Sequence, residues 1–86
     1  MTGVRYRLAR GMRLRREPSG AAFLMVPEGI VTINETAATA LELADGTRDF
    51  ETIVAALRER FDDAGGTLSD DVRELFDAFA ERGFVT

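Results

Sequence analysis

Residues 26–34 constrain the fold of this chain more than any other stretch. A turn signal, Pro27-Glu28-Gly29, is followed at once by the β-branched residues 30–33 and then by Asn34, a helix-capping residue. Proline presets φ for the second position of a turn, and glycine can adopt the conformation that closes it. Residues 30–33 carry no charge, and an uncharged strand at a sheet edge is open to pairing with another chain. The stretch is therefore expected to be either a weakness or a binding site.

Two strands are predicted before this turn. Residues 12–15 alternate apolar and charged side chains with a period of two, as a half-buried strand does. Residues 17–20 form a turn cluster, and residues 21–26 are almost continuously apolar, which is typical of a central strand. With residues 30–33 these segments predict a three-stranded antiparallel β-meander.

The loop lengths suggest a register for this meander. A three-residue loop at residues 27–29 pairs Val26 with Ile30, and a four-residue loop at residues 17–20 pairs Arg16 with Ala21. One face of the sheet then carries only apolar side chains, those of Met12, Leu14, Phe23, Met25, Val31 and Ile33. The opposite face carries Arg13, Arg15, Ala22, Leu24, Ile30 and Thr32. We therefore expect the first face to be buried.

Three helices are predicted to follow. Asn34 caps residues 35–44, and Asp45-Gly46 closes that helix. Asp49 caps the second helix and Ser69 the third, which ends at Gly83 in a Schellman-type motif with Phe84 against Phe79. Apolar stripes at helical spacing are expected to face the core, namely Phe50, Ile53, Val54, Leu57 and Phe61, then Val72, Leu75, Phe76 and Phe79. Residues 11–86 thus predict a single α+β domain.

The residue types argue against catalysis. The chain of 86 residues has no histidine, cysteine or lysine, and all 11 of its basic residues are arginine. These absences remove the commonest general base, the thiol nucleophile, the Schiff-base amine and the usual nitrogen and sulfur metal ligands. We therefore expect that the protein is not an enzyme, has no catalytic residue and binds neither a metal nor a cofactor. We find neither an apolar signal segment nor a membrane span, so a soluble cytoplasmic protein without membrane contact is the default expectation.

Charge is divided unevenly along the chain. The first 16 residues hold six arginines and no carboxylate, whereas the remainder holds five arginines and all 15 Asp and Glu residues, so +6 and −10 give the net charge of −4. Residues 1–10 are interpreted as a basic N-terminal arm. The arm could steer an acidic partner, or it could simply be solvated at the surface, and the sequence favours neither.

Two stretches resemble the PqqD family. Residues 23–34, FLMVPEGIVTIN, are similar to the proline-glutamate-glycine hairpin of that family, and residues 37–48, AATALELADGTR, are similar to its first helix with the closing Asp-Gly-x-Arg. The similarity continues as a pattern through Ile53, Leu57 and Phe61 to the closing Gly83-Phe84. It covers residues 11–86, nearly the whole predicted domain.

The resemblance implies a RiPP recognition element of winged helix-turn-helix type. Such proteins bind the leader of a ribosomally made precursor peptide, here PqqA-like, and present it to a radical SAM enzyme, here PqqE-like, in pyrroloquinoline quinone biosynthesis. The leader is expected to add as a strand to the third strand and to lie against the third helix. The matching positions are Ile30, Val31, Thr32 and Ile33 on the strand and Val72, Leu75, Phe76 and Phe79 on the helix.

Two other interpretations are weighed against this one. A winged helix-turn-helix can bind DNA, but the third helix carries five carboxylates against two arginines, which disfavours contact with phosphates. We therefore expect no nucleic-acid partner. The uncharged edge could instead be covered by the N-terminal arm or by a second copy of the chain, so a homodimer stays open.

Overall fold

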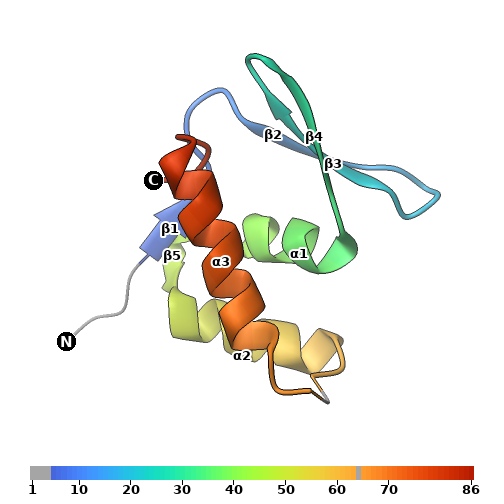
Figure 1. Cartoon of the computed structure of the whole chain (residues 1–86), viewed down its shortest axis with the longest axis vertical. Coiled ribbons are helices and arrows are strands. Elements are labelled where there is room, and N and C mark those ends of the chain that lie inside the picture. Colours follow the sequence, from blue (N-terminus) through green and yellow to red (C-terminus); the bar gives the residue numbers. More distant parts are fainter. Residues whose placement is uncertain (1–4, 64) are drawn as a thin grey trace.

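The computed structural model describes residues 5–63 and 65–86, which form five strands and three α-helices (Figure 1). In chain order these are β1 (Arg5–Arg7), β2 (Arg13–Arg16), β3 (Ala22–Val26), β4 (Gly29–Ile33), α1 (Glu35–Leu43), β5 (Asp45–Asp49), α2 (Phe50–Arg60) and α3 (Leu68–Glu81). The predicted α+β class, with an antiparallel β2-β3-β4 meander and three helices, is confirmed.

The register of the meander differs from the predicted one by a single residue in both hairpins. Val26 pairs with Gly29 around a two-residue loop, and Arg16 pairs with Ala22 around a five-residue loop. The predicted Val26–Ile30 and Arg16–Ala21 pairs are therefore wrong. The tighter loop is possible because Gly29 adopts φ of +152°, a conformation that L side chains rarely take.

Because of this shift, the side chains of the central strand β3 lie on the faces opposite to those predicted, whereas the side chains of β2 and β4 lie on the predicted faces. Leu14, Val31 and Ile33 pack on the core as predicted. On β3, however, Ala22 and Leu24 are buried, and Phe23 and Met25 lie on the outer face, opposite to the prediction. Every residue of β3 is apolar, so the sequence contains no alternation that could distinguish its two faces.

The helix caps follow local chemistry at two of the three helices. Asn34 and Asp49 accept the predicted bonds from the amides of Ala37 and Thr52. The third prediction is wrong, because α3 begins at Leu68 with Thr67 as its N-cap and Ser69 lies within its first turn. At the other end, Phe84 N–H donates to the Phe79 carbonyl and their rings meet edge to face at 5.5 Å, confirming the Schellman-type ending.

Part of the predicted basic arm belongs to the fold. Residues 1–4 lie outside the described residues, but Arg5–Arg7 forms β1, which pairs with β5, a strand that the sequence analysis missed. Arg5 lies opposite Asp49 and Arg7 opposite Asp45, so each pairing sets opposite charges across the two strands. On the other side of β1, Arg7 exchanges two backbone hydrogen bonds with Thr86.

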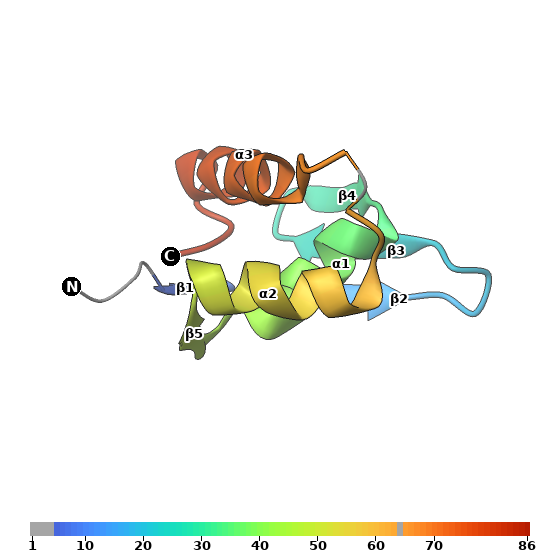
Figure 2. The same cartoon turned by 90° about the horizontal axis from the view of Figure 1, so that it is seen from below.

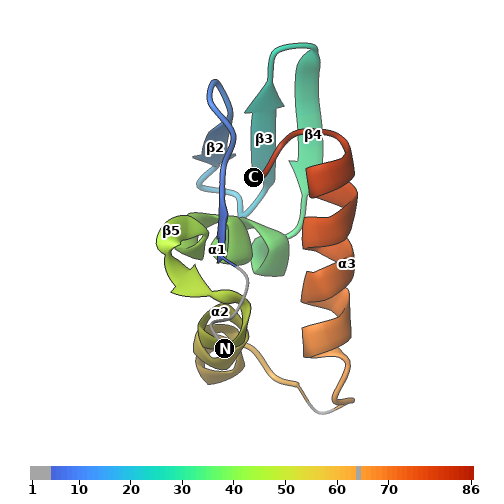
Figure 3. The same cartoon turned by 90° about the vertical axis from the view of Figure 1, so that its left-hand side faces the viewer.

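The core lies between the inner face of the meander and the three helices. Its fully buried side chains include Leu24 from β3, Leu41 from α1, Leu57 from α2 and Phe76 from α3. Tyr6 of β1 stacks on Phe76 with 4.4 Å between ring centroids. Figures 2 and 3 show α3 on the side of the sheet where β4 lies, with β2 at the far edge. In the described parts of the chain, no helix is long and apolar enough to cross a membrane.

Candidate functional site

The hydrogen-bonding pattern gives β4 a free edge with two outward-facing residues. Val26 and Gly29 flank a two-residue loop and form a hydrogen-bonded pair, so bonded pairs alternate from there along the hairpin. Val31 and Ile33 therefore bond to β3, whereas the N–H and C=O groups of Ile30 and Thr32 point away from it. The Glu17 N–H to Ala21 C=O bond on the other side of β3 fits the same alternation.

The side chains of β4 alternate between two environments. Ile30 is 61% exposed and Thr32 is exposed, both on the outer face of the sheet. Val31 and Ile33 are half-buried and pack against the core. No charged residue occurs in β4, and no described strand pairs with its outer edge. The predicted strand residues thus form one continuous edge with both a backbone and an apolar component.

The four predicted residues of α3 differ in accessibility. Leu75 is half-buried, whereas Val72, Phe76 and Phe79 are 2%, 0% and 8% exposed. Phe76 lies under Tyr6 and Phe50, and Phe79 packs on Phe84. Among the four, Leu75 and Val72 line the hollow described next, and the two phenylalanines lie behind them in the core.

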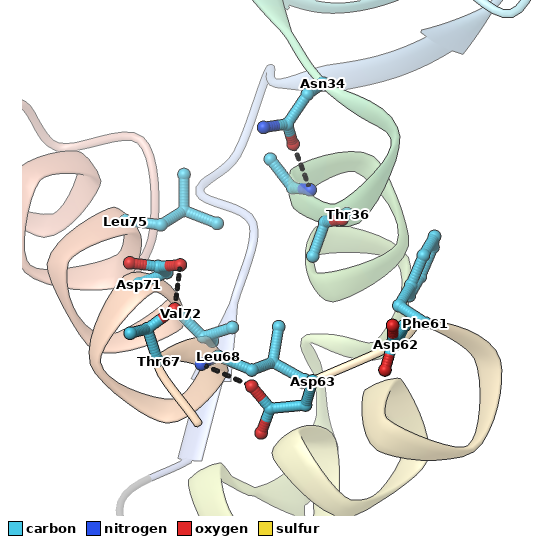
Figure 4. Close-up of a pocket in the computed structure, with 11 residues that line it drawn as sticks. Asn34, Thr36, Phe61, Asp62, Asp63, Thr67, Leu68, Asp71, Val72 and Leu75 are labelled. Carbon is cyan, nitrogen blue, oxygen red and sulfur yellow. Dashed lines mark hydrogen bonds between the residues drawn. The ribbon is translucent and has the colours of Figure 1, made fainter. Parts of the chain in front are cut away.

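A cavity of about 340 Å³ opens where β4 ends and α1 begins (Figure 4). Leu68, Val72 and Leu75 of α3 form one wall, and Asn34, Thr36 and Ala37 at the start of α1 form the wall opposite. Phe61, Asp62, Asp63, Thr67 and Asp71 complete the lining. Because Asn34 directly follows Ile33, an extended chain running along β4 would reach this cavity.

Two of the carboxylates around the cavity, Asp63 and Asp71, have structural partners. Asp63 accepts a bond from the Leu68 amide at 3.0 Å and pairs with Arg58 at 3.2 Å. The Leu68 amide, followed by Arg58, holds the pKa of Asp63 below its usual value. Asp71 accepts a bond from the Thr67 hydroxyl at 3.3 Å. Within residues 5–63 and 65–86 no group of three carboxylates is placed to hold a metal ion.

At the opposite edge of the sheet, Arg16 of β2 forms hydrogen bonds to α1. Its guanidinium donates to Glu42 at 3.1 Å, to Glu35 at 3.2 Å and to the buried Thr39 hydroxyl at 3.0 Å. These bonds cross from β2 to three successive turns of α1, so they set the position of the sheet relative to the helix that follows β4.

Comparison with known proteins assigns the family. The family model for PqqD, coenzyme PQQ synthesis protein D, matches residues 21–85. A PqqA binding protein of Klebsiella pneumoniae is 44% identical over 78 residues, which are 90% of this chain and 84% of that protein. A PqqA binding protein of Azotobacter vinelandii is 42% identical over 79 residues, 91% and 85% of the two chains. The chain belongs to the PqqD family.

Solved structures give the same fold. The solution NMR structure of the PqqD part of Methylobacterium extorquens PqqCD, described as a RiPP recognition element, matches with a TM-score of 0.78 at 24% identity, over 94% of this chain and 87% of that one. TbiB1 in complex with the TbiA(beta) leader peptide matches with a TM-score of 0.73 at 15% identity, over 92% and 93%. The resemblance inferred from the hairpin and first helix is confirmed, as is a family of binding proteins rather than enzymes.

The sequence predicted the strand residues of this candidate site but not the cavity. Asn34 was predicted only as a helix cap, and Thr67 and Leu68 were assigned no role. These residues come from the start of α1, the α2–α3 loop and α3, and only the folded chain brings them together. A polar loop between two capped helices, residues 61–67, was the one local signal that could have indicated them.

Proposed function

We propose that the chain binds the leader of a PqqA-like precursor peptide as an added strand on β4 and presents it to a PqqE-like radical SAM enzyme in pyrroloquinoline quinone biosynthesis. The observation that carries this proposal is the uncharged free edge of β4, with the backbone groups of Ile30 and Thr32 directed outward. Strand addition uses such groups for affinity and neighbouring pockets for specificity. Membership of the family and the names of its relatives support the same function.

The surroundings of β4 suit a peptide with alternating side chains. In an added strand, every second side chain would lie on the inner side, next to Val31 and Ile33. The cavity beyond Ile33 offers room for one further side chain. Val72 contributes to its wall, while Phe76 and Phe79 act by holding α3 in place. Each backbone hydrogen bond would contribute about 1 kcal/mol net.

Charge continues to disfavour DNA as the ligand. The exposed residues of α3 include five carboxylates, Asp70, Asp71, Glu74, Asp77 and Glu81. Arg73 of α3 and Arg82 at its C-cap lie over the rings of Phe50 and Phe84. A helix with this surface would repel phosphates in a major groove. The cytoplasmic location expected from the sequence stays a prediction.

An NMR titration tests the proposal. Isotope-labelled protein is titrated with an unlabelled PqqA-like peptide, and backbone amide shifts are followed residue by residue. We expect the largest shifts in residues 30–33 and around Leu75, with saturation at one peptide per chain. Shifts confined to residues 5–16, or none at peptide concentrations well above those of the protein, would contradict strand addition at β4. A random DNA duplex at low salt is the matched negative control.

A further inference from the structure

The outer face of the meander is organised as two cross-strand rows. The register places Arg13, Met25 and Ile30 in one row and Arg15, Phe23 and Thr32 in the other. These six residues are referred to as the outer sheet patch. Each row runs from an arginine on β2, over a large apolar side chain on β3, to the free edge at β4.

The centre of the outer sheet patch is apolar although it faces away from the core. Phe23 and Met25 are partly exposed and belong to none of the buried clusters, and Ile30 is 61% exposed. The uncovered face of an antiparallel sheet is normally polar. Three neighbouring apolar side chains on such a face are typical of an interaction surface.

The arginines beside this centre differ from Arg5, Arg7 and Arg16, whose side chains are held by other parts of the fold. Arg5 and Arg7 donate to backbone carbonyls of β5, and Arg16 is held by two carboxylates of α1. Arg15 meets only the half-buried Glu17, at 3.5 Å, and Arg13 has no ion pair among the described residues. The margin of the outer sheet patch is therefore cationic, and its complement is an apolar spot bordered by carboxylates.

We propose that the outer sheet patch is the docking surface for the enzyme that modifies the bound peptide, and that this enzyme presents an apolar spot with an acidic border. The inference rests on the proposed function, because an added strand on β4 would continue both rows beyond Ile30 and Thr32. The peptide and the enzyme would then meet on a single face. Bound peptide would extend this face by one strand, so it would also raise the affinity for the enzyme.

Charge reversal tests the proposal with a matched control. Arg13→Glu and Arg60→Glu make the same change in net charge, and Arg60 is exposed on α2, away from the sheet. The purified radical SAM enzyme from the same locus is titrated with wild-type chain, each variant and Phe23→Thr. We expect Arg13→Glu and Phe23→Thr to weaken binding by about tenfold and Arg60→Glu to change it by less than about twofold. All three variants should bind the peptide as the wild type does.

The outcomes separate this inference from the proposed function. If the wild type binds peptide but the enzyme binds Arg13→Glu and Phe23→Thr as tightly as wild type, or does not bind the wild type at all, docking at the outer sheet patch is excluded. If wild type binds no peptide, the proposed function itself fails. Sedimentation completes the test, because a wild-type dimer that Arg13→Glu dissociates would assign the patch to a second copy and overturn enzyme docking.

Discussion

β2 and β4 are the two edge strands of one three-stranded sheet, but the charged residues of β2 disfavour pairing with a further strand, whereas the uncharged residues of β4 permit it. β2 carries Arg13, Arg15 and Arg16, charges of the kind that natural sheets use to prevent edge pairing. Its Arg16 is also bonded to α1. β4 has no charge, and in the described chain nothing pairs with its outer edge. The contrast is the one expected if β2 has a structural role and β4 is the edge to which the peptide adds, as proposed above.

The largest expected effect on stability distinguishes the two edges of β4, the one that bonds to β3 and the one that is free. Val31→Pro removes an amide that bonds to β3, so we expect a loss of about 3 kcal/mol in the free energy of unfolding. Thr32→Pro removes an outward amide, so the protein should stay folded while losing most of its affinity for the peptide. Chemical denaturation and peptide titration of both variants provide the measurement. Equal destabilisation by the two prolines would contradict the assigned hydrogen-bonding alternation.

The next effect compares the turns that lead to each edge. Gly29 and Gly20 have φ of +152° and +99°, and an added Cβ would meet no atom within 4 Å at either position. Alanine at each site should therefore destabilise through backbone strain alone, by about 1–3 kcal/mol. We expect Gly29→Ala to reduce peptide affinity in the folded protein and Gly20→Ala to leave it unchanged. Peptide titration of both variants, below their unfolding transitions, measures the two affinities. Equal losses of affinity would contradict peptide binding at β4.

Arg16 allows the structural role of the β2 edge to be tested. Arg16→Met removes bonds to Glu35, Thr39 and Glu42, and partial exposure limits the expected loss to about 1–2 kcal/mol. Arg15→Met, which removes only the exposed contact with Glu17, should change stability by less than about 0.5 kcal/mol. Both variants should bind peptide normally when folded. Thermal unfolding measures the difference, and equal melting temperatures would refute the special role of Arg16.

The smallest effect comes from placing a β2-like charge on β4. Thr32 is exposed on the outer face, so Thr32→Arg should change stability by less than about 0.5 kcal/mol. A cross-strand pair of opposite charges contributes up to about 1 kcal/mol. The affinity of Thr32→Arg should therefore rise by about twofold to fivefold for a peptide with glutamate opposite this position. It should fall by a similar factor for a peptide with lysine there. Calorimetry with the two peptides is the readout. If the affinity of Thr32→Arg does not depend on the charge of the peptide, the peptide does not bind beside Thr32.

The limits of sequence-based prediction follow from where the specifying interactions lie. The faces of β2 and β4 could be predicted because their side chains alternate, whereas all-apolar β3 gives no such signal. Asn34 and Asp49 bond within their own helices, but the first amide of α3 is satisfied by Asp63, five residues earlier. Caps formed across a loop are not evident from a local motif.

Tertiary contacts explain the remaining differences. β5 has the sequence DGTRD, which predicts a turn, and it forms a strand because β1 lies beside it with arginines opposite its aspartates. The cavity at the end of β4 depends on three separate segments, so its lining could not be assembled from any single stretch. The free edge of β4 could be predicted from the sequence because β-branching, neutrality and the preceding turn are all local properties.

Amide hydrogen exchange with and without the PqqA-like peptide tests strand addition at β4 most directly. We expect the amides of Ile30 and Thr32, which are unpaired in the free protein, to become protected on binding. The amides of Val31 and Ile33, already bonded to β3, should change little. This alternating pattern is expected only if a strand pairs with the outer edge. Protection of Leu14 and Arg16 on β2 instead, or an equal change at all four β4 amides, would contradict it.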